Sequence, residues 1–173
     1  MKTIRTKVYS FSELNEDAKQ VAIEWYRYAD ICDYSIAWET TEEDAKEIGL
    51  KLIQLSDHKA NKGEFLLSAN EVAQNIFNNH GADCQTYKTA QSFMEEWQPI
   101  FTNYMDENHT DYESGESEDK MQELEDSFLY SLLEDYRIMY NADIDYQNTD
   151  EYIIEAIEAN QYNFTKDGKI FNY

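Results

Sequence analysis

Residues 116–139 read Glu116-Ser-Glu-Asp-Lys-Met-Gln-Glu-Leu-Glu-Asp-Ser-Phe-Leu-Tyr-Ser-Leu-Leu-Glu-Asp-Tyr-Arg-Ile-Met139, and apolar side chains recur along this stretch with the period of a helix. An α-helix has about 3.6 residues per turn, so side chains three or four positions apart share one face. The apolar positions with that spacing are Met121, Leu124, Phe128, Leu132, Tyr136 and Met139. They predict a long amphipathic helix with one buried stripe.

Acidic side chains gather on the opposite face of the same predicted helix. They are Glu116, Asp119, Glu123, Asp126 and Glu134. With a rise of about 1.5 Å per residue, the row covers about 27 Å, which is one carboxylate every ~6–7 Å. DNA places a phosphate every ~3.4 Å of axis along each strand. The row is therefore sparser than a DNA strand by about a factor of two, and neighbouring acids, among them Asp143 and Asp145, are expected to add to it.

Negative charge is concentrated around this helix. The 173-residue chain has 36 Asp and Glu against 14 Lys and Arg, a net charge of -22. Residues 106–158 hold 18 of the acids and only two bases, Lys120 and Arg137, a net charge of -16. A solvated face that keeps the protein soluble is the simplest explanation, but a modest net charge is sufficient for solubility. The strong self-repulsion of this segment favours a surface that binds a basic partner.

Tyrosines interleave with the acids of this segment. A tyrosine offers a large contact area and a polar tip, and it is enriched at protein interfaces. Tyrosines at helical spacing, such as Tyr136, are expected in the core. Tyr112 and Tyr130 are predicted to contact the partner.

The rest of the chain predicts further helices. A Ser or Thr followed three residues later by Glu is a capping box, Gly favours the left-handed end of a helix, and Pro removes a backbone N–H. Asn15 is predicted to cap a first helix, whose buried stripe is Ala18, Val21, Ala22, Trp25 and Ala29. A second helix is predicted over about 38–48, where Thr40 and Glu43 begin it and Gly49 ends it, and a third begins with Ser68 and Glu71 and ends at Gly81. A fourth starts at about Thr86 and is kinked or split by Pro99 near residues 96–98, and a short fifth lies around 153–157.

Three segments predict a small amount of β structure. Residues 3–9 alternate like a short opening strand, and residues 50–55 read as a strand with an antiparallel mate at 63–67. Residues 162–171 resemble a hairpin that turns at Asp167-Gly168. With 42% hydrophobic and 14% aromatic residues, the chain is expected to fold as one helix-rich α+β domain over residues 1–173 with a small antiparallel sheet.

Composition also excludes several classes of partner and compartment. A pI near 4.2 opposes direct binding to nucleic acid or to an anionic membrane. The polar start of the chain lacks the apolar core of a signal peptide, and no run approaches ~18 apolar residues. Cys32 and Cys84 lie far apart without CxxC spacing. These features predict a cytoplasmic protein with reduced thiols, with no membrane contact and no direct contact with nucleic acid.

Motifs for catalysis or metal binding are weak. Asp143-x-Asp145-x-Gln147 begins like a calcium loop, but Asn148 takes the usual Gly position and Ile154 the place of the final Glu. His80 and Cys84 have i, i+4 spacing, but no second pair completes a zinc site. The pattern acid-x-Lys recurs, as expected by chance in so acidic a chain. No catalytic residue, metal or cofactor is predicted.

Several short phrases are similar to sequences of one kind of protein. Tyr9-Ser-Phe-Ser-Glu-Leu14, Glu43-Asp-Ala-Lys-Glu-Ile-Gly49 and Phe164-Thr-Lys-Asp-Gly-Lys169 resemble small acidic orphan proteins of bacteriophages and mobile elements. The resemblance covers about the first hundred residues and the tail. It implies a phage-like origin, and small acidic phage proteins include DNA mimics that disable restriction enzymes or CRISPR effectors. It implies no catalytic residues.

The sequence therefore predicts a non-enzymatic, phage-encoded inhibitor that blocks the nucleic-acid groove of a host defence nuclease, either a CRISPR effector or a restriction enzyme. Its predicted contact residues are Glu116, Asp119, Glu123, Asp126, Glu134, Asp143, Asp145, Tyr112 and Tyr130. An antitoxin or assembly factor that binds a basic partner protein remains an alternative. A metal-dependent enzyme is a third, less favoured hypothesis.

Overall fold

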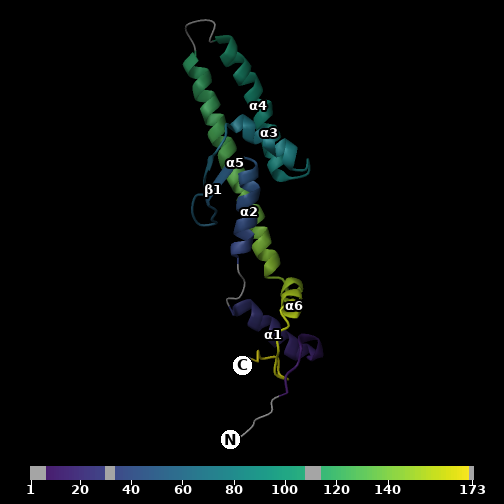
Figure 1. Ribbon diagram of the computed structural model, residues 1–173. Helices are drawn as coiled ribbons and strands as arrows, with labels where there is room; N and C mark the ends of the chain where they lie inside the picture. Colours follow the sequence, from purple (N-terminus) through teal and green to yellow (C-terminus); the bar gives the residue numbers. More distant parts are fainter. Residues whose placement is uncertain (1–6, 30–33, 108–113, 172–173) are drawn as a thin grey trace. The chain divides into compact units, whose positions relative to one another are not determined.

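The computed structural model describes residues 7–29, 34–107 and 114–171, without the side chains of residues 103, 104, 106, 107 and 114–117. Within these ranges the chain forms helices and one two-stranded antiparallel sheet (Figure 1). The predicted helix-rich α+β class is confirmed. The chain divides into a larger unit, residues 37–141, and a smaller unit, residues 1–36 with 142–173. That residues 1–173 act as one domain stays a prediction.

The larger unit contains the sheet and the long helices. Its elements are α2 (Ser35–Glu47, from residue 37), β1 (Leu50–Gln54), β2 (Lys62–Phe65), α3 (Ala69–Asn79), α4 (Gln85–Glu107) and α5 (Ser114–Gln147, to residue 141). Buried side chains from α2, β1, α3, α4 and α5 form one core, among them Ala45, Leu50, Val72, Ile76, Phe93, Phe128, Leu132 and Tyr136. Phe93 stacks on Phe128, with ring centroids 4.2 Å apart, so the core joins α4 to α5.

The predicted amphipathic helix is longer than its apolar stripe. Phe128, Leu132 and Tyr136 of the stripe are buried, whereas Met139 is 42% exposed. α5 continues to Gln147, beyond the last apolar position of the predicted stripe. Leu133 is also buried because it packs against Gly63 of β2, where an added Cβ would lie 2.6 Å from the leucine side chain. The hairpin therefore covers a second side of α5.

Local signals placed some helix ends correctly and others wrongly. Ser68 and Glu71 form the predicted capping box at the start of α3. Gly49 adopts a φ of 89°, as expected after α2. The prediction that Thr40 begins a helix is wrong, because α2 begins at Ser35 and Thr40 lies inside it. Gly81 does not end α3, because the chain leaves that helix in an extended conformation at His80.

Pro99 does not split α4. The helix is continuous from Gln85 to Glu107 with the proline inside it. The Pro99 ring is exposed, so the carbonyl that loses its N–H partner can bond to water on that side. The prediction that Pro99 splits the helix near residues 96–98 is therefore wrong, and the alternative of a kink there stays a prediction.

The smaller unit joins segments that lie far apart in the sequence. Its helices are η1 (Phe11–Glu13), α1 (Glu16–Tyr28) and α6 (Asp150–Ala159), and its core includes Phe11, Ala22, Ile23, Tyr26, Ile153, Ile157 and Phe164. Asn15 caps α1 as predicted, but the buried stripe includes Ile23 and Tyr26, while Val21 is 39% exposed. Thr149 caps the predicted short helix α6.

Isolated bridges replace the strands predicted for the smaller unit. Residues 3–6 of the predicted opening strand lie outside the described residues, and Tyr9 forms a single antiparallel bridge with Phe164. Phe164 forms a second bridge with Ile170, which brings the tail back on itself as predicted. Gly168 makes the turn with a φ of 83°.

Candidate functional site

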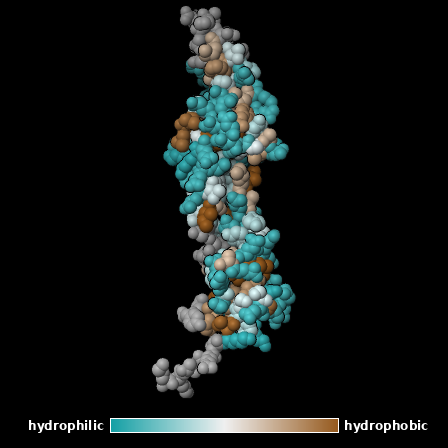
Figure 2. All heavy atoms as spheres, turned by 45° about the vertical axis from the view of Figure 1, so that its right-hand side comes forward, coloured by the Kyte–Doolittle hydropathy of each residue, from teal (hydrophilic) through white to brown (hydrophobic). Residues whose placement is uncertain are grey.

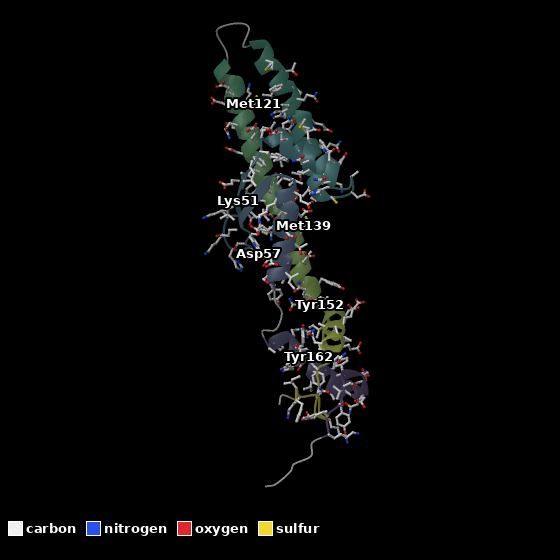
Figure 3. All side chains as sticks on the ribbon, in the orientation of Figure 1. Lys51, Asp57, Met121, Met139, Tyr152 and Tyr162 are labelled. Atoms are coloured by element: carbon white, nitrogen blue, oxygen red, sulfur yellow. The ribbon has the colours of Figure 1, made fainter. Side chains whose placement is uncertain are left out.

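A row of exposed side chains runs along α5 in the larger unit. We name it the α5 ridge, and it consists of Asp119, Glu123, Asp126, Tyr130 and Glu134. At about 100° per residue, these positions fall within roughly 80° of one another around the helix. The first four are exposed, and Tyr130 retains 66% of its accessible surface. Met121 and Met139 mark this stretch of α5 in Figure 3. The structure thus places the described part of the predicted acidic row on one face.

Arg137 interrupts the acidic character of the ridge at one end. Its Nε donates to Glu134 Oε2 at 2.9 Å, and its guanidinium also pairs with Asp57 in the loop between β1 and β2. Asp57 is labelled in Figure 3. The hydrogen bonds from Arg137 hold the pKa of the Glu134 carboxyl below its ordinary value. Asn61 donates to the same carboxylate. Glu134 therefore holds the loop against α5, which the sequence alone did not indicate.

The remaining acids of the ridge are not neutralised. Across residues 7–29, 34–107 and 114–171, no Lys, Arg or His side chain forms an ion pair with Asp119, Glu123 or Asp126. The rise from Asp119 to Asp126 is about 10 Å, so three carboxylates follow one another every ~5 Å. These three carboxylates are closer together than the average spacing of the whole predicted row.

Four predicted contact residues are not counted in the α5 ridge. Tyr112 and the side chain of Glu116 lie outside the described residues. Asp143 and Asp145 are exposed on α5 but belong to the smaller unit. Because they are two residues apart on a helix, their side chains point about 200° apart, so at most one of them can lie on the face of the ridge residues.

The surroundings of the ridge are also acidic. Residues 89–102 of α4 and 118–131 of α5 carry seven carboxylates and one base, Lys120. The carboxylates are Glu95, Glu96, Glu118, Asp119, Glu123, Glu125 and Asp126. Hydrophilic residues cover much of the face of the molecule that Figure 2 shows. An anionic field of this extent attracts cationic surfaces and repels nucleic acid.

A groove separates α4 from α5 beside the ridge. We name it the serine groove, and its lining residues are Thr89, Ser92, Phe93, Glu96, Leu124, Ser127, Phe128 and Ser131. Its volume is about 260 Å³. The stacked rings of Phe93 and Phe128, each 3% exposed, form its floor. Small hydroxyl side chains from both helices form much of its walls.

A buried carboxyl lies at one end of the serine groove. Asp135 is 7% exposed and accepts a hydrogen bond of 2.6 Å from the Thr89 hydroxyl. Burial raises the pKa of the Asp135 carboxyl above its ordinary value, and the bond from Thr89 opposes this rise. Asp135 follows Phe128 by seven residues, so the helical spacing that predicts the apolar stripe also places Asp135 on that face, a signal that could have identified it.

We expect Asp135→Asn to stabilise the protein at pH 7 by on the order of 0.5 kcal/mol, since nearby water screens the charge that it removes. The pKa of the Asp135 carboxyl is higher in the folded protein than in the unfolded chain, so protonation of this group favours folding. This stabilisation is complete below the ordinary Asp pKa of about 4 and is lost as the pH rises through the raised pKa. Urea denaturation at pH 7 and pH 3.5 measures the effect, which should vanish at the lower pH. Asp126→Asn removes the same charge from an exposed site, and an equal gain from it would contradict the prediction.

A polar network in the core accounts for His80. Its Nδ1 lies 2.7 Å from the Thr86 hydroxyl and its Nε2 lies 3.6 Å from Asp44. The Tyr136 hydroxyl donates to the same Asp44 carboxylate at 2.8 Å, and burial raises the pKa of that tyrosine. Asp44 belongs to α2, Thr86 to α4 and Tyr136 to α5, so these contacts connect three helices to His80, the residue after α3. Thr86 and Tyr136 are buried. Cys84 is exposed and takes no part.

The described residues contain no group of three or more His, Cys, Asp or Glu side chains arranged to hold a metal ion. Residues 143–147, whose spacing begins like a calcium loop, are helical in α5. Within the part of the chain that the structure describes, no helix is long and apolar enough to cross a membrane. Comparison with protein-family models, curated proteins and solved structures finds no match to this chain.

Proposed function

We propose that the protein is a non-enzymatic inhibitor, encoded by a phage, that blocks the nucleic-acid groove of a host defence nuclease. The observation that carries the proposal is the exposed, unneutralised row of Asp119, Glu123 and Asp126 on one face of α5. The target is a CRISPR effector or a restriction enzyme, whose groove is lined with Lys and Arg because it binds phosphates. Binding alone excludes the substrate, so no turnover is required.

The spacing and charge of the ridge support this proposal. Three carboxylates about 5 Å apart provide a charge density similar to that of a nucleic-acid strand over a short distance. A net charge of -22 speeds association with a cationic groove and disfavours binding to partners with acidic surfaces. The exposed Tyr130 adds a rigid contact that does not depend on salt.

We expect the triple variant Asp119→Asn, Glu123→Gln, Asp126→Asn to inhibit about tenfold more weakly, because each exposed charge pair contributes about 0.2–1 kcal/mol. The measurement is cleavage of duplex DNA by a panel of restriction enzymes and CRISPR effector nucleases, with each variant titrated at low and high salt. For the parent, inhibition should weaken as salt rises, since salt screens exposed charges.

The control is Glu151→Gln, Glu155→Gln, Glu158→Gln on α6, which removes the same charge from exposed positions of the smaller unit. This control should inhibit as the parent does. The proposal is wrong if the parent inhibits no nuclease in the panel, or if the ridge variant inhibits as strongly as the parent. Stoichiometric capture of a basic protein without nuclease activity, with no effect on DNA cleavage, would favour the antitoxin or assembly-factor alternative.

A further inference from the structure

We infer that the serine groove between α4 and α5 binds a basic amphipathic helix of a partner protein. This inference extends the proposed function, from which it takes only the basic character of the partner. The groove lies beside the α5 ridge, and its lining residues are different from those of the ridge.

The dimensions of the groove fit side chains of a helix. Its volume of about 260 Å³ is below the ~300–1,000 Å³ of sites for drug-sized ligands. Its walls run over residues 89–96 of α4 and 124–131 of α5, about two helical turns or ~10 Å on each side. A shallow channel of this length accommodates a few side chains from one face of a helix.

Small side chains allow the backbone of a third helix to approach closely. Ser92, Ser127 and Ser131 line the groove, and small residues at a contact favour the short end of the 8–10 Å range of helix separations. A helix satisfies its own backbone hydrogen bonds, whereas an extended segment would need a continuous row of partners. Three separate hydroxyls do not provide such a row. The walls therefore favour a helix over a strand.

The floor and the rim of the groove specify the chemistry of that helix. The Phe93 and Phe128 rings close the bottom of the groove with only 3% of each residue exposed, so the half-buried Leu124 provides the main apolar contact for a side chain of the partner. Glu96 lies within the groove, and Asp135 lies at its end with one hydrogen bond, from Thr89. With seven carboxylates and one base on the surrounding stretches, the flanks of the bound helix must be Lys- or Arg-rich. A second copy of this chain would bring acidic surfaces together.

The test uses the full-length protein and a fluorescent 21-residue synthetic helix with Leu and Ala on one face and Lys and Arg on its flanks. We expect Ser127→Leu to weaken its binding at least tenfold in fluorescence anisotropy, because the larger side chain fills the groove. Gln122→Leu places the same side chain at an exposed position of α5 outside the groove and should leave binding unchanged. Both sites are exposed, so neither change should alter the fold.

Charge is tested with a neighbouring pair. Glu96→Gln should weaken binding about threefold, and Glu95→Gln, which removes the same charge from an exposed position outside the groove, should weaken it less. Equal effects of the two leucine variants, or equal binding of a scrambled peptide with the same charge, would overturn the inference. So would self-association of the parent that Ser127→Leu abolishes, because the occupant would then be a second copy.

The two proposals fail separately. The triple ridge variant should bind the synthetic helix more weakly, because it loses three of the seven carboxylates, but its binding should still depend on Ser127, since the three residues do not line the groove. Peptide binding that depends on Ser127, without inhibition of any nuclease, would leave the groove inference standing and remove the proposed function. Nuclease inhibition without peptide binding would remove the groove inference alone.

Discussion

Phe128→Ala is expected to destabilise the larger unit by about 3–5 kcal/mol. The ring is 3% exposed, stacks on Phe93 at 4.2 Å and lies 5.6 Å from the ring of Phe65. Its removal therefore leaves a cavity where α4, α5 and β2 meet. The Phe128 side chain packs between α4, α5 and β2, so its loss weakens the packing of all three elements.

Urea denaturation followed by circular dichroism measures this loss. Tyr130→Ala is the matched control, because it removes an aromatic ring two residues further along the same helix from a position that is 66% exposed. Its cost should be within about 0.5 kcal/mol. Similar losses for the two variants would mean that the Phe128 ring is not part of a packed core.

Gly168→Ala is expected to detach the tail from α1 in the smaller unit, at a cost of at least about 2 kcal/mol. Gly168 has a φ of 83°, which an alanine adopts only with strain. An added Cβ would also lie 2.0 Å from the carbonyl oxygen of Ala18, a backbone atom within α1 that cannot turn aside. Both effects oppose the observed position of the tail.

Detachment of the tail would expose an aromatic cluster. The Trp25 ring packs edge-on against Tyr162 at 5.4 Å and against Phe164 at 6.0 Å. Hydrogen exchange should become faster in α1 and in residues 162–170 and stay unchanged in the larger unit. Gly81→Ala is the control, since the nearest atom to its added Cβ is a flexible Cys84 sulfur at 4.0 Å. Unchanged exchange in Gly168→Ala would contradict the prediction.

Capping motifs in the sequence predicted those helices whose first turn is held by a hydrogen bond between one side chain and a nearby backbone group. Ser68 with Glu71, and Asn15 with Ala18, are such pairs. Thr40 with Glu43 has the same spacing but lies inside α2, because the spacing of a capping box also occurs within any helix. Such a pattern identifies a helix more reliably than it identifies the first residue.

Long-range packing determined what the sequence did not predict. The hydrogen-bond partner of Asp135 is Thr89, 46 positions earlier, and helical periodicity does not indicate it. Glu134 was predicted on the acidic face, but there it pairs with Arg137, which also pairs with Asp57 of the loop between β1 and β2. Helical periodicity places Arg137 on the same face, so its pairing with Glu134 three residues earlier could have been predicted. The contact of Arg137 with Asp57 depends on the position of the loop between β1 and β2, and helical periodicity gives no information about that position.

The order in which the polypeptide is synthesised has a consequence for the smaller unit. α1 packs with Ile153 and Ile157 of α6, which follow it by more than a hundred residues. At ~5–20 residues per second, the ribosome needs roughly 6–25 s to make that intervening length. Through this interval Ala22, Ile23 and Tyr26 have no partner from α6, while residues 37–141 are contiguous and can fold on emergence. A translation pause after residue 141 would therefore leave an apolar helix open to chaperones and proteases.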